Sequence, residues 1–250
     1  MSNLYHLNYK YFFIGVIAIL LSTVIASSAD EYNGLEGLIE PSEVAEVSGQ
    51  MPGIVDEILV ERGDIVKKGR VIARLKSGVE KVAVELAHAR VEFGRRKLIR
   101  NEELYRKQLL SIHEKDEMET ELKIMELQLQ EAQEKLELRI IRSPIDGVVV
   151  ERLLSHGEYT GEETIMKIVQ IDPLYVEVVI PVEQFGTIKK GMKAQVQPES
   201  AVGGKYTAEV IIVDSVIDAA SGTFGVRLKL PNKSFNLPPG LKCEVFFLKR

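Results

Sequence analysis

The sequence is poor in cysteine and has no excess of positive charge. Cys243 is the only cysteine among the 250 residues, so no internal disulfide can form and packed apolar cores must supply the stability. The formal net charge is −5, whereas proteins that bind nucleic acid need a basic surface to displace counterions from phosphates. We therefore expect no nucleic-acid partner.

Residue patterns typical of catalytic, phosphate-binding and metal-binding sites are also missing. The four histidines, His6, His88, His113 and His156, are scattered and lack the spacing of a metal site. Gly-x-Ser-x-Gly and Walker-type loops are absent, and Cys243 falls in an expected C-terminal strand, where a packed thiol is a better interpretation than a nucleophile. The sequence therefore predicts no enzyme activity, no metal and no cofactor.

An apolar run near the N-terminus predicts export. Residues 11–26 follow Lys10 and lead into the small residues of positions 26–29, which is the layout of a secretory signal peptide. We expect residues 1–29 to form this signal peptide. An uncleaved membrane anchor is the alternative, although the run is slightly shorter than the ~20 apolar residues of a full span.

Short β-strands separated by glycine turns are expected over residues 40–75. The same pattern of short apolar segments and glycines returns after the middle of the chain. It forms a repeat at an offset of 94 residues that aligns Gly53 with Gly147 and Gly63 with Gly157. We expect these four glycines to hold turns that need a positive φ or a close backbone approach. The repeat predicts two halves of one pseudo-symmetric β domain.

Between these halves, residues 79–139 have the composition of long helices, with one glycine and no proline. Apolar residues recur at alternating spacings of four and three, a heptad pattern that predicts helices packed along each other. The expected seam residues are Val79, Val82, Leu86, Ala89 and Phe93 in the first helix, and Met118, Leu122, Met125, Leu129, Ala132 and Leu136 in the second.

A tight reversal is expected between the two helices, at residues 108–111. Ser111 is a candidate N-cap, and Glu114, three residues later, completes a capping box. Basic residues outnumber acidic ones in the first helix and the reverse holds in the second, which favours antiparallel pairing, although each exposed ion pair contributes under ~1 kcal/mol. The sequence predicts a hairpin held mainly by its apolar seam.

Short strands recur after residue 172 with no long helix among them. The expected strands are 174–180, 206–213, 224–230 and 241–248, separated by turns that contain glycine or proline. This spacing predicts a small β-barrel or sandwich. The expected fold class is therefore mainly β, with a long α-helical hairpin.

The glycine-bounded halves resemble the split lipoyl-like domain, or barrel-sandwich hybrid, of HlyD-like membrane fusion proteins, the periplasmic adaptors of tripartite efflux and secretion systems. The matching residues are Gly53-Ile54-Val55, Val60, Gly63-Asp64, Val66, Gly69 and Leu75, then Arg142-Ser143-Pro144-Ile145-Asp146-Gly147-Val148-Val149 and Gly157. In that family a coiled-coil hairpin is inserted between the lipoyl halves and a β-barrel follows. The resemblance implies a first lipoyl half at 40–76, the hairpin at 77–140, a second half at 141–171 and the barrel at 172–250.

Three residues near the reversal resemble the tip motif with which these adaptors contact the outer-membrane channel. Arg100, Leu104 and Ser111 have the family spacing of Arg, three residues, Leu, six residues, Ser. The resemblance assigns them to channel docking, and a plain capped turn is the alternative.

The resemblance implies a non-enzymatic adaptor in the periplasm, associated with the inner membrane. Its partners would be an inner-membrane transporter of RND or ABC type and an outer-membrane factor channel. Self-association into a ring, a hexamer in the family, is implied as well. The sequence ends at Arg250, directly after the expected barrel, so we expect the membrane-proximal domain of larger family members to be absent or reduced.

Two other functions stay open at this point. Lipoyl and biotinyl carrier domains share the β fold and bear a modified lysine at a tight hairpin, which makes Lys76 and Lys81 candidates. The helical insertion at that point and export away from cytoplasmic ligases disfavour a carrier. The third function is that of a structural coiled-coil spacer without a role in transport.

Overall fold

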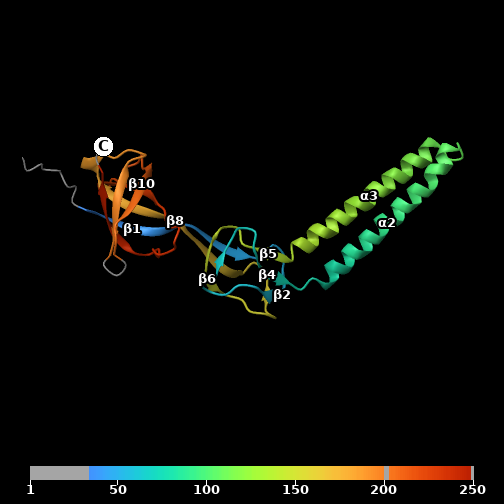
Figure 1. Ribbon diagram of the computed structural model, residues 1–250, viewed down its shortest axis with the longest axis horizontal. Helices are drawn as coiled ribbons and strands as arrows, with labels where there is room; N and C mark the ends of the chain where they lie inside the picture. Colours follow the sequence, from blue (N-terminus) through green and yellow to red (C-terminus); the bar gives the residue numbers. More distant parts are fainter. Residues whose placement is uncertain (1–33, 200–202, 249–250) are drawn as a thin grey trace, which may run out of the picture.

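The computed structural model describes residues 34–199 and 203–248, and the molecule is elongated (Figure 1). A β-barrel, a smaller β domain and a helical hairpin follow one another along the long axis, which confirms the predicted fold class. The expected signal segment, residues 1–29, lies outside the described residues. Within the described residues, no helix is long and apolar enough to cross a membrane.

The elements follow the order β, α, β along the chain. The first part comprises β1 (Leu35–Ser48), β2 (Gly53–Ile58), β3 (Ile65–Val66), β4 (Val71–Leu75), α2 (Gly78–Arg106) and α3 (Ile112–Glu137). The second part comprises β5 (Ile140–Arg142), β6 (Gly147–Arg152), β7 (Tyr159–Thr160), β8 (Thr164–Pro181), the 3-10 turn η1 (Val182–Gln184), β9 (Lys193–Pro198), β10 (Tyr206–Val213), β11 (Thr223–Leu230) and β12 (Lys242–Phe247).

The smaller β domain consists of two halves related by the offset of 94 residues. The amide of Gly63 donates a hydrogen bond to the carbonyl oxygen of Val149 at 2.8 Å. The equivalent residues of the other half, Gly157 and Val55, form the matching bond, also at 2.8 Å. Strand β3 pairs with β6 as β7 pairs with β2. These equivalences confirm the pseudo-symmetry that the sequence repeat predicts.

The barrel closes because β1 pairs with β12 on one side and with β8 on the other. The strand order around it is β1, β12, β9, β10, β11, β8 and back to β1. Side chains of a strand alternate between the two faces, and the inward-facing ones of β8, at Leu174, Val176, Val178 and Ile180, are all buried in its core. None of the strands expected from the sequence corresponds to β9. The buried residues of β9 are Ala194, Val196 and Pro198, and so few apolar positions leave a weak pattern in the sequence.

Strands β1 and β8 run from the barrel into the smaller β domain as one antiparallel ribbon. Their pairing extends from Gly37 opposite Val178 to Ser48 opposite Thr164, with bulges along the way. The expected boundary between residues 171 and 172 falls inside β8. The two β units therefore share continuous hydrogen-bonded strands at their junction.

Helices α2 and α3 form the predicted antiparallel hairpin (Figure 1). Side-chain burial along α3 confirms the seam predicted for that helix. All six predicted seam residues of α3 are half-buried. Gly94 of α2 lies close against two of them, because a Cβ added there would stand 3.1 Å from Met125 Sδ and 3.2 Å from Leu122 Cδ1. Nearer the tip, Asn101 Nδ2 contacts Met118 Sδ at 3.1 Å.

The seam predicted for α2 was wrong. Val79, Val82, Leu86 and Phe93 are 82, 63, 53 and 54% exposed, and Ala89 is exposed as well. The buried or half-buried residues of α2 that follow a heptad alternation are Val84, Ala87, Val91, Gly94, Leu98, Asn101 and Tyr105. This second heptad stripe contains five apolar residues besides Gly94 and Asn101, so apolar content alone does not separate it from the predicted stripe, which has five and continues into Arg96 and Arg100. Gly94 lets α3 pack closely against the second stripe.

Candidate docking site at the hairpin tip

The tip of the hairpin is a tight reversal between the end of α2 and the start of α3. Gln108 adopts a left-handed conformation with φ of 57°, which costs a residue other than glycine about 1–2 kcal/mol. The amide of Gln108 donates to the carbonyl of Tyr105, and that of Leu109 donates to the carbonyl of Leu104, both at 2.9 Å. The reversal lies where the sequence predicts it.

The start of α3 carries the predicted capping box. The Oγ atom of Ser111 accepts a hydrogen bond from the amide of Glu114 at 3.2 Å. In return, Glu114 Oε2 accepts from the amide and the hydroxyl of Ser111, at 2.8 and 2.7 Å. The backbone hydrogen bond from Ser111, and then that from its hydroxyl, hold the pKa of the Glu114 carboxyl below its usual value. Both hydrogen-bonding capacities of the Ser111 hydroxyl are thus used inside the tip.

The three residues assigned to channel docking do not form one cluster. Arg100 and Leu104 are both exposed and lie one turn apart on the outer face of α2. Ser111 belongs to the turn on the other side of the reversal, where it caps α3. The structure therefore brings Arg100 and Leu104 onto one surface and gives Ser111 a local structural role.

Two apolar residues at the tip were not among the predicted site residues. Leu109 is 71% exposed and Ile112 is 67% exposed, on either side of the N-cap. A reversal in solvent is ordinarily polar, so the run Leu109, Leu110, Ser111, Ile112 was the sequence signal for this feature. Together with Leu104 these side chains give the hairpin an apolar end, which is typical of a contact surface.

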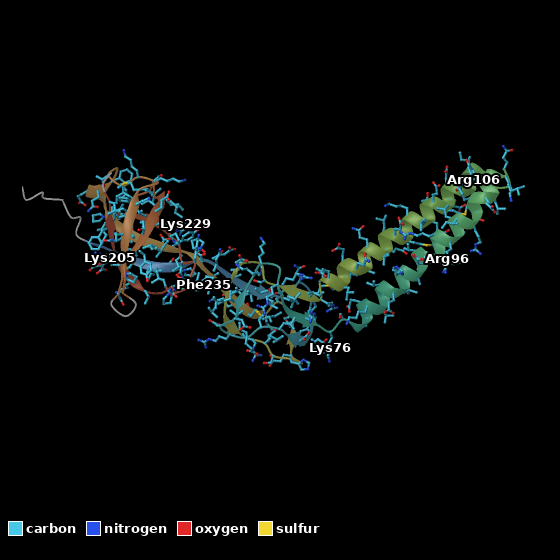
Figure 2. The ribbon with its side chains drawn as sticks, viewed as in Figure 1. Lys76, Arg96, Arg106, Lys205, Lys229 and Phe235 are labelled. Atoms are coloured by element: carbon cyan, nitrogen blue, oxygen red, sulfur yellow. The ribbon has the colours of Figure 1, made fainter. Side chains whose placement is uncertain are left out.

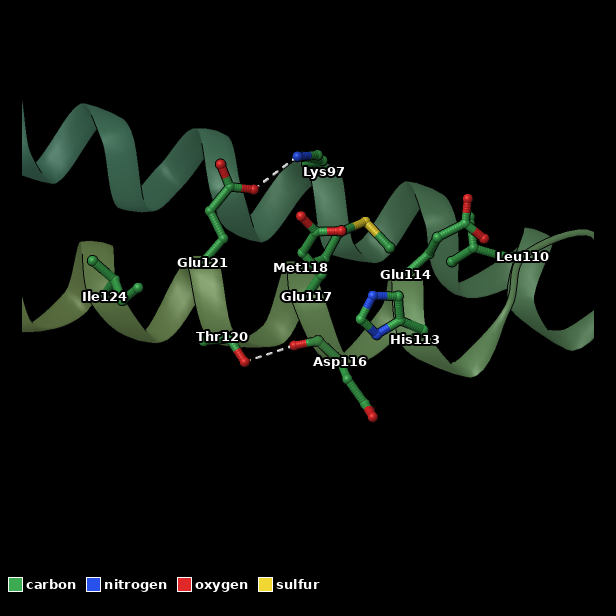
Figure 3. Close-up of a pocket in the computed structure, with 10 residues that line it drawn as sticks. All are labelled: Lys97, Leu110, His113, Glu114, Asp116, Glu117, Met118, Thr120, Glu121 and Ile124. Carbon is green, nitrogen blue, oxygen red and sulfur yellow. Dashed lines mark hydrogen bonds and ion pairs between the residues drawn. The ribbon is translucent and has the colours of Figure 1, made fainter.

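An open groove of about 780 Å³ runs along α3 just below the tip (Figure 3). Its lining includes Leu110, His113, Met118 and Ile124, and the ion pair between Lys97 Nζ and Glu121 Oε2, at 2.8 Å, crosses between the helices beside it. Most of these side chains are exposed. The groove widens the tip surface but does not enclose a small molecule.

The four predicted turn glycines occupy two kinds of position. Gly63 and Gly157 have positive φ angles of 96° and 85°. At Gly53 an added Cβ would lie 2.7 Å from Arg139 Nη1, and at Gly147 it would lie 2.3 Å from the carbonyl oxygen of Val169. Contacts at 2.3 Å are shorter than real Cβ atoms allow, so β6 and β8 approach as closely as they do only with glycine at position 147.

Lys76, one of the two lysines considered for a carrier, lies at the junction of β4 and α2 (Figure 2). Its side chain is exposed, and its amide donates to the carbonyl of Ile54 at 2.8 Å. Lys81 lies in the first turns of α2. Neither lysine is at the tip of a tight β-hairpin, because the chain passes here from a strand into a helix of 29 residues.

Comparison with known proteins matches both β units. Residues 43–170 match the model of the CzcB-like, barrel-sandwich hybrid domain, and residues 173–249 match that of the CusB-like, beta-barrel domain. The cobalt-zinc-cadmium resistance protein CzcB of Cupriavidus metallidurans is 24% identical over 245 residues, which cover 89% of this chain and 47% of that protein. The toluene efflux pump periplasmic linker protein TtgA of Pseudomonas putida is 24% identical over 227 residues, covering 83% and 58%.

Solved structures show the same fold. A MacA-MexA chimeric protein that contains the Pseudomonas aeruginosa MexA α-hairpin domain superposes with a TM-score of 0.73 at 20% identity, covering 86% of this chain and 83% of that one. MacA from Actinobacillus actinomycetemcomitans gives a TM-score of 0.60 at 19% identity, covering 87% and 79%. The chain spans about half of the length of CzcB and somewhat more of TtgA.

Proposed function

We propose, because the chain belongs to the family defined by the CzcB-like barrel-sandwich hybrid domain, that it acts as a periplasmic adaptor of an efflux or secretion system. More finely, we place it with the HlyD-like membrane fusion proteins that its glycine pattern resembles. In this function it links an inner-membrane transporter, of RND or ABC type, to an outer-membrane factor channel. Its role is mechanical and needs no catalytic group or cofactor.

The observation that carries this proposal is the exposed apolar tip at the end of a long, capped hairpin. Helix α2 has 29 residues, so at 1.5 Å per residue it extends about 44 Å beyond the smaller β domain. Leu104, Leu109 and Ile112 stand exposed at its far end. A surface of this kind, held far from both β units, supports contact with a separate partner across the periplasm.

The proposed docking surface includes Arg100 and Leu104 on the outer face of α2, extended by Leu109 and Ile112. Leu104, Leu109 and Ile112 would bury apolar area against the channel, and Arg100 would donate charged hydrogen bonds. Ser111 supports this surface by capping α3. The barrel, at the opposite end of the molecule, would face the transporter, and several copies would assemble into a ring, a hexamer as in related adaptors.

The carrier alternative finds less support. Lys76 and Lys81 lie at the strand-to-helix junction and in the first turns of α2, whereas carrier lysines need a tight turn presented to a ligase. The exported, periplasmic location proposed for the chain, with residues 1–29 as signal peptide or anchor, separates it from such ligases.

Crosslinking from the tip tests the proposal. A photo- or thiol-reactive probe at Leu109→Cys, in a Cys243→Ser background, would be placed in cells of the native host and its products identified by mass spectrometry. Leu109 is preferred to Ser111 as the probe position because its side chain is free of the capping box. Val216→Cys, 80% exposed on the barrel, is the matched control.

We expect the probe at Leu109 to capture an outer-membrane channel and the probe at Val216 not to capture one. If the tip captures no channel while the protein is folded and present at normal levels in the envelope, the adaptor proposal fails. A mass search for a lipoyl or biotinyl group on Lys76 and Lys81 would then separate a carrier from a spacer.

A further inference from the structure

The seam of the hairpin ends at the tip in a pair of residues that is not aliphatic. Tyr105 is the last seam residue of α2, and Lys115 is the next seam position of α3 beyond Met118, three residues away. The Nζ atom of Lys115 lies 4.6 Å from the centroid of the Tyr105 ring. A cation over an aromatic ring is attracted by the electrons of its face. One cation–π contact therefore joins the two helices across the reversal.

Lys115 is held in this position by a second contact. Its Nζ atom pairs with Glu119 Oε1 at 3.5 Å, one turn further along α3. Only 28% of the Lys115 side chain is exposed, whereas Lys135, which pairs with Glu131 at the same spacing, is 58% exposed. Shielding from water strengthens the attraction between a cation and a ring. The contact of Lys115 with Tyr105 is thus partly sheltered from solvent.

The backbone of the reversal brings two leucines of the docking surface together. The amide of Leu109 donates to the carbonyl of Leu104, and the amide of Gln108 donates to that of Tyr105. These two bonds define a Schellman motif, in which residues at the positions of Leu104 and Leu109 commonly make an apolar contact. The conformation of the reversal therefore decides whether the two leucines form one surface.

Gln108 occupies the position of this motif that glycine usually takes. Its φ of 57° is left-handed, a conformation that a side chain disfavours. A residue in such a conformation persists only where its surroundings hold it there. Tyr105 contributes to this hold twice, because its carbonyl accepts the bond from Gln108 and its ring is fixed by Lys115.

We propose that Tyr105 and Lys115 are positioning residues of the docking tip. By joining the last turn of α2 to the first turn of α3, they hold Gln108 in its left-handed conformation and so present Leu104 and Leu109 as one surface. They act through the reversal and not by touching the channel. Without them fewer molecules have the binding conformation, and the apparent affinity falls by the same fraction. This inference rests on the proposed docking of the tip.

Channel capture in the native host tests the proposal, with the probe at Ile112→Cys in a Cys243→Ser background so that both leucines stay in place. Tyr105→Leu keeps an apolar seam residue but removes the ring, and we expect the yield of capture to fall about two- to fivefold, the effect of a cation–π contact of this exposure. Lys115→Met should do the same, and the double variant should lose no more than either single one. Lys123→Met, at an exposed lysine of the same helix, is the matched control and should leave capture unchanged.

Two further variants separate positioning from direct contact with the channel. Tyr105→Phe keeps the ring and should capture as well as the native side chain. Glycine adopts the left-handed conformation without steric cost, so Gln108→Gly added to Tyr105→Leu should restore capture although it adds no group that could touch the channel. The proposal is overturned if Tyr105→Leu or Lys115→Met captures normally, if Tyr105→Phe loses capture as Tyr105→Leu does, or if Gln108→Gly restores nothing.

A second measurement does not depend on the channel. A nitroxide spin label at Leu109→Cys, also in the Cys243→Ser background of the full chain, reports the mobility of the reversal by electron paramagnetic resonance. We expect its mobility to rise in Tyr105→Leu and to return when Gln108→Gly is added. Unchanged mobility overturns the positioning role. If the native tip captures no channel while the mobility changes as expected, it is the docking function that fails and not the hold on the reversal.

Discussion

The guanidinium group of Arg139 donates two hydrogen bonds to the same carboxylate oxygen of Glu80, at 2.9 and 2.6 Å. Both side chains are largely shielded, at 15 and 17% exposure. Arg139 also donates from Nη1 to the carbonyl oxygen of Pro52 at 2.8 Å. One side chain just beyond α3 thus holds the start of α2 and the edge of the smaller β domain, and it anchors the hairpin at its base.

Breaking this anchor should lower the free energy of unfolding more than breaking an exposed ion pair. Arg139→Met leaves the shielded carboxylate of Glu80 without its partner, so we expect the free energy of unfolding to fall by about 2 kcal/mol. Lys135→Met, which breaks the exposed pair with Glu131, should cost under ~0.5 kcal/mol. Urea denaturation measures both, and equal losses would show that Arg139 is not an anchor.

Acid should weaken the same anchor. A hydrogen bond from its own backbone amide and those from Arg139 outweigh desolvation and lower the pKa of the Glu80 carboxyl below 4.5. The stability that this group contributes is therefore present above pH 4.5 and is lost as the pH falls through the lowered pKa. The difference in unfolding free energy between the native chain and Glu80→Gln should shrink over that range, and a constant difference would contradict it.

Gly147→Ala should disrupt the second half of the smaller β domain. The added methyl group would stand 2.3 Å from the carbonyl oxygen of Val169, so β6 must move away from β8. We expect a loss of about 3 kcal/mol in denaturant unfolding. Gly161→Ala is the control, because its nearest neighbour would be a side-chain atom of Tyr159 at 3.8 Å, and it should be nearly neutral.

Two valines distinguish the observed seam of α2 from the seam that the sequence predicts. Val91 is 1% exposed and Val82 is 63% exposed. Val91→Ala should therefore lower the free energy of unfolding by about 2 kcal/mol more than Val82→Ala. Both substitutions replace valine with alanine within a helix, so the change in helix propensity is the same and cancels when the two variants are compared. The comparison is made on the unassembled chain by thermal circular dichroism. A larger effect at Val82 would restore the seam that the sequence predicts.

Leu104→Asp should abolish channel docking without unfolding the protein. Leu104 is 40% exposed, so its replacement by a charged residue removes an apolar contact rather than a core residue. The readout is channel capture from the Leu109→Cys probe, which we expect to fall at least tenfold. Val216→Asp, an equally polar change on the barrel, should leave capture unchanged. Normal capture by Leu104→Asp at normal protein levels would remove Leu104 from the docking surface.

Alkaline pH should destabilise the barrel through its thiol. Burial raises the pKa of Cys243 from 9.0 to about 11. The unfolded chain therefore releases this proton first, and stability falls as the pH rises from about 9 to 11, by roughly 1.4 kcal/mol per unit at most. Cys243→Ala should lose less stability than the native chain over this range. Parallel losses in both proteins would show that the thiol does not contribute.

Features that depend on neighbouring residues could be predicted from the sequence. The glycine turns, the helical composition of residues 79–139 and the capping box of Ser111 and Glu114 are local, because each involves residues within a few positions of one another. The repeat at 94 residues added one long-range relation, since it was present twice. The order of β half, helical hairpin, β half and a further β unit followed from these patterns, whereas the lipoyl-like character of the two halves came from the family resemblance.

Only the tertiary structure decided which surfaces meet. Helix α2 carries two heptad stripes with the same number of apolar residues, and the seam is the one that contains Gly94, where α3 lies close at Leu122 and Met125. The bond from Arg139 to Glu80 joins residues 59 positions apart, and no local pattern indicates it. The pairing of β1 with β8 likewise joins segments that are far apart in the sequence. Periodicity shows which faces can be buried, but packing between distant segments selects the face that is buried.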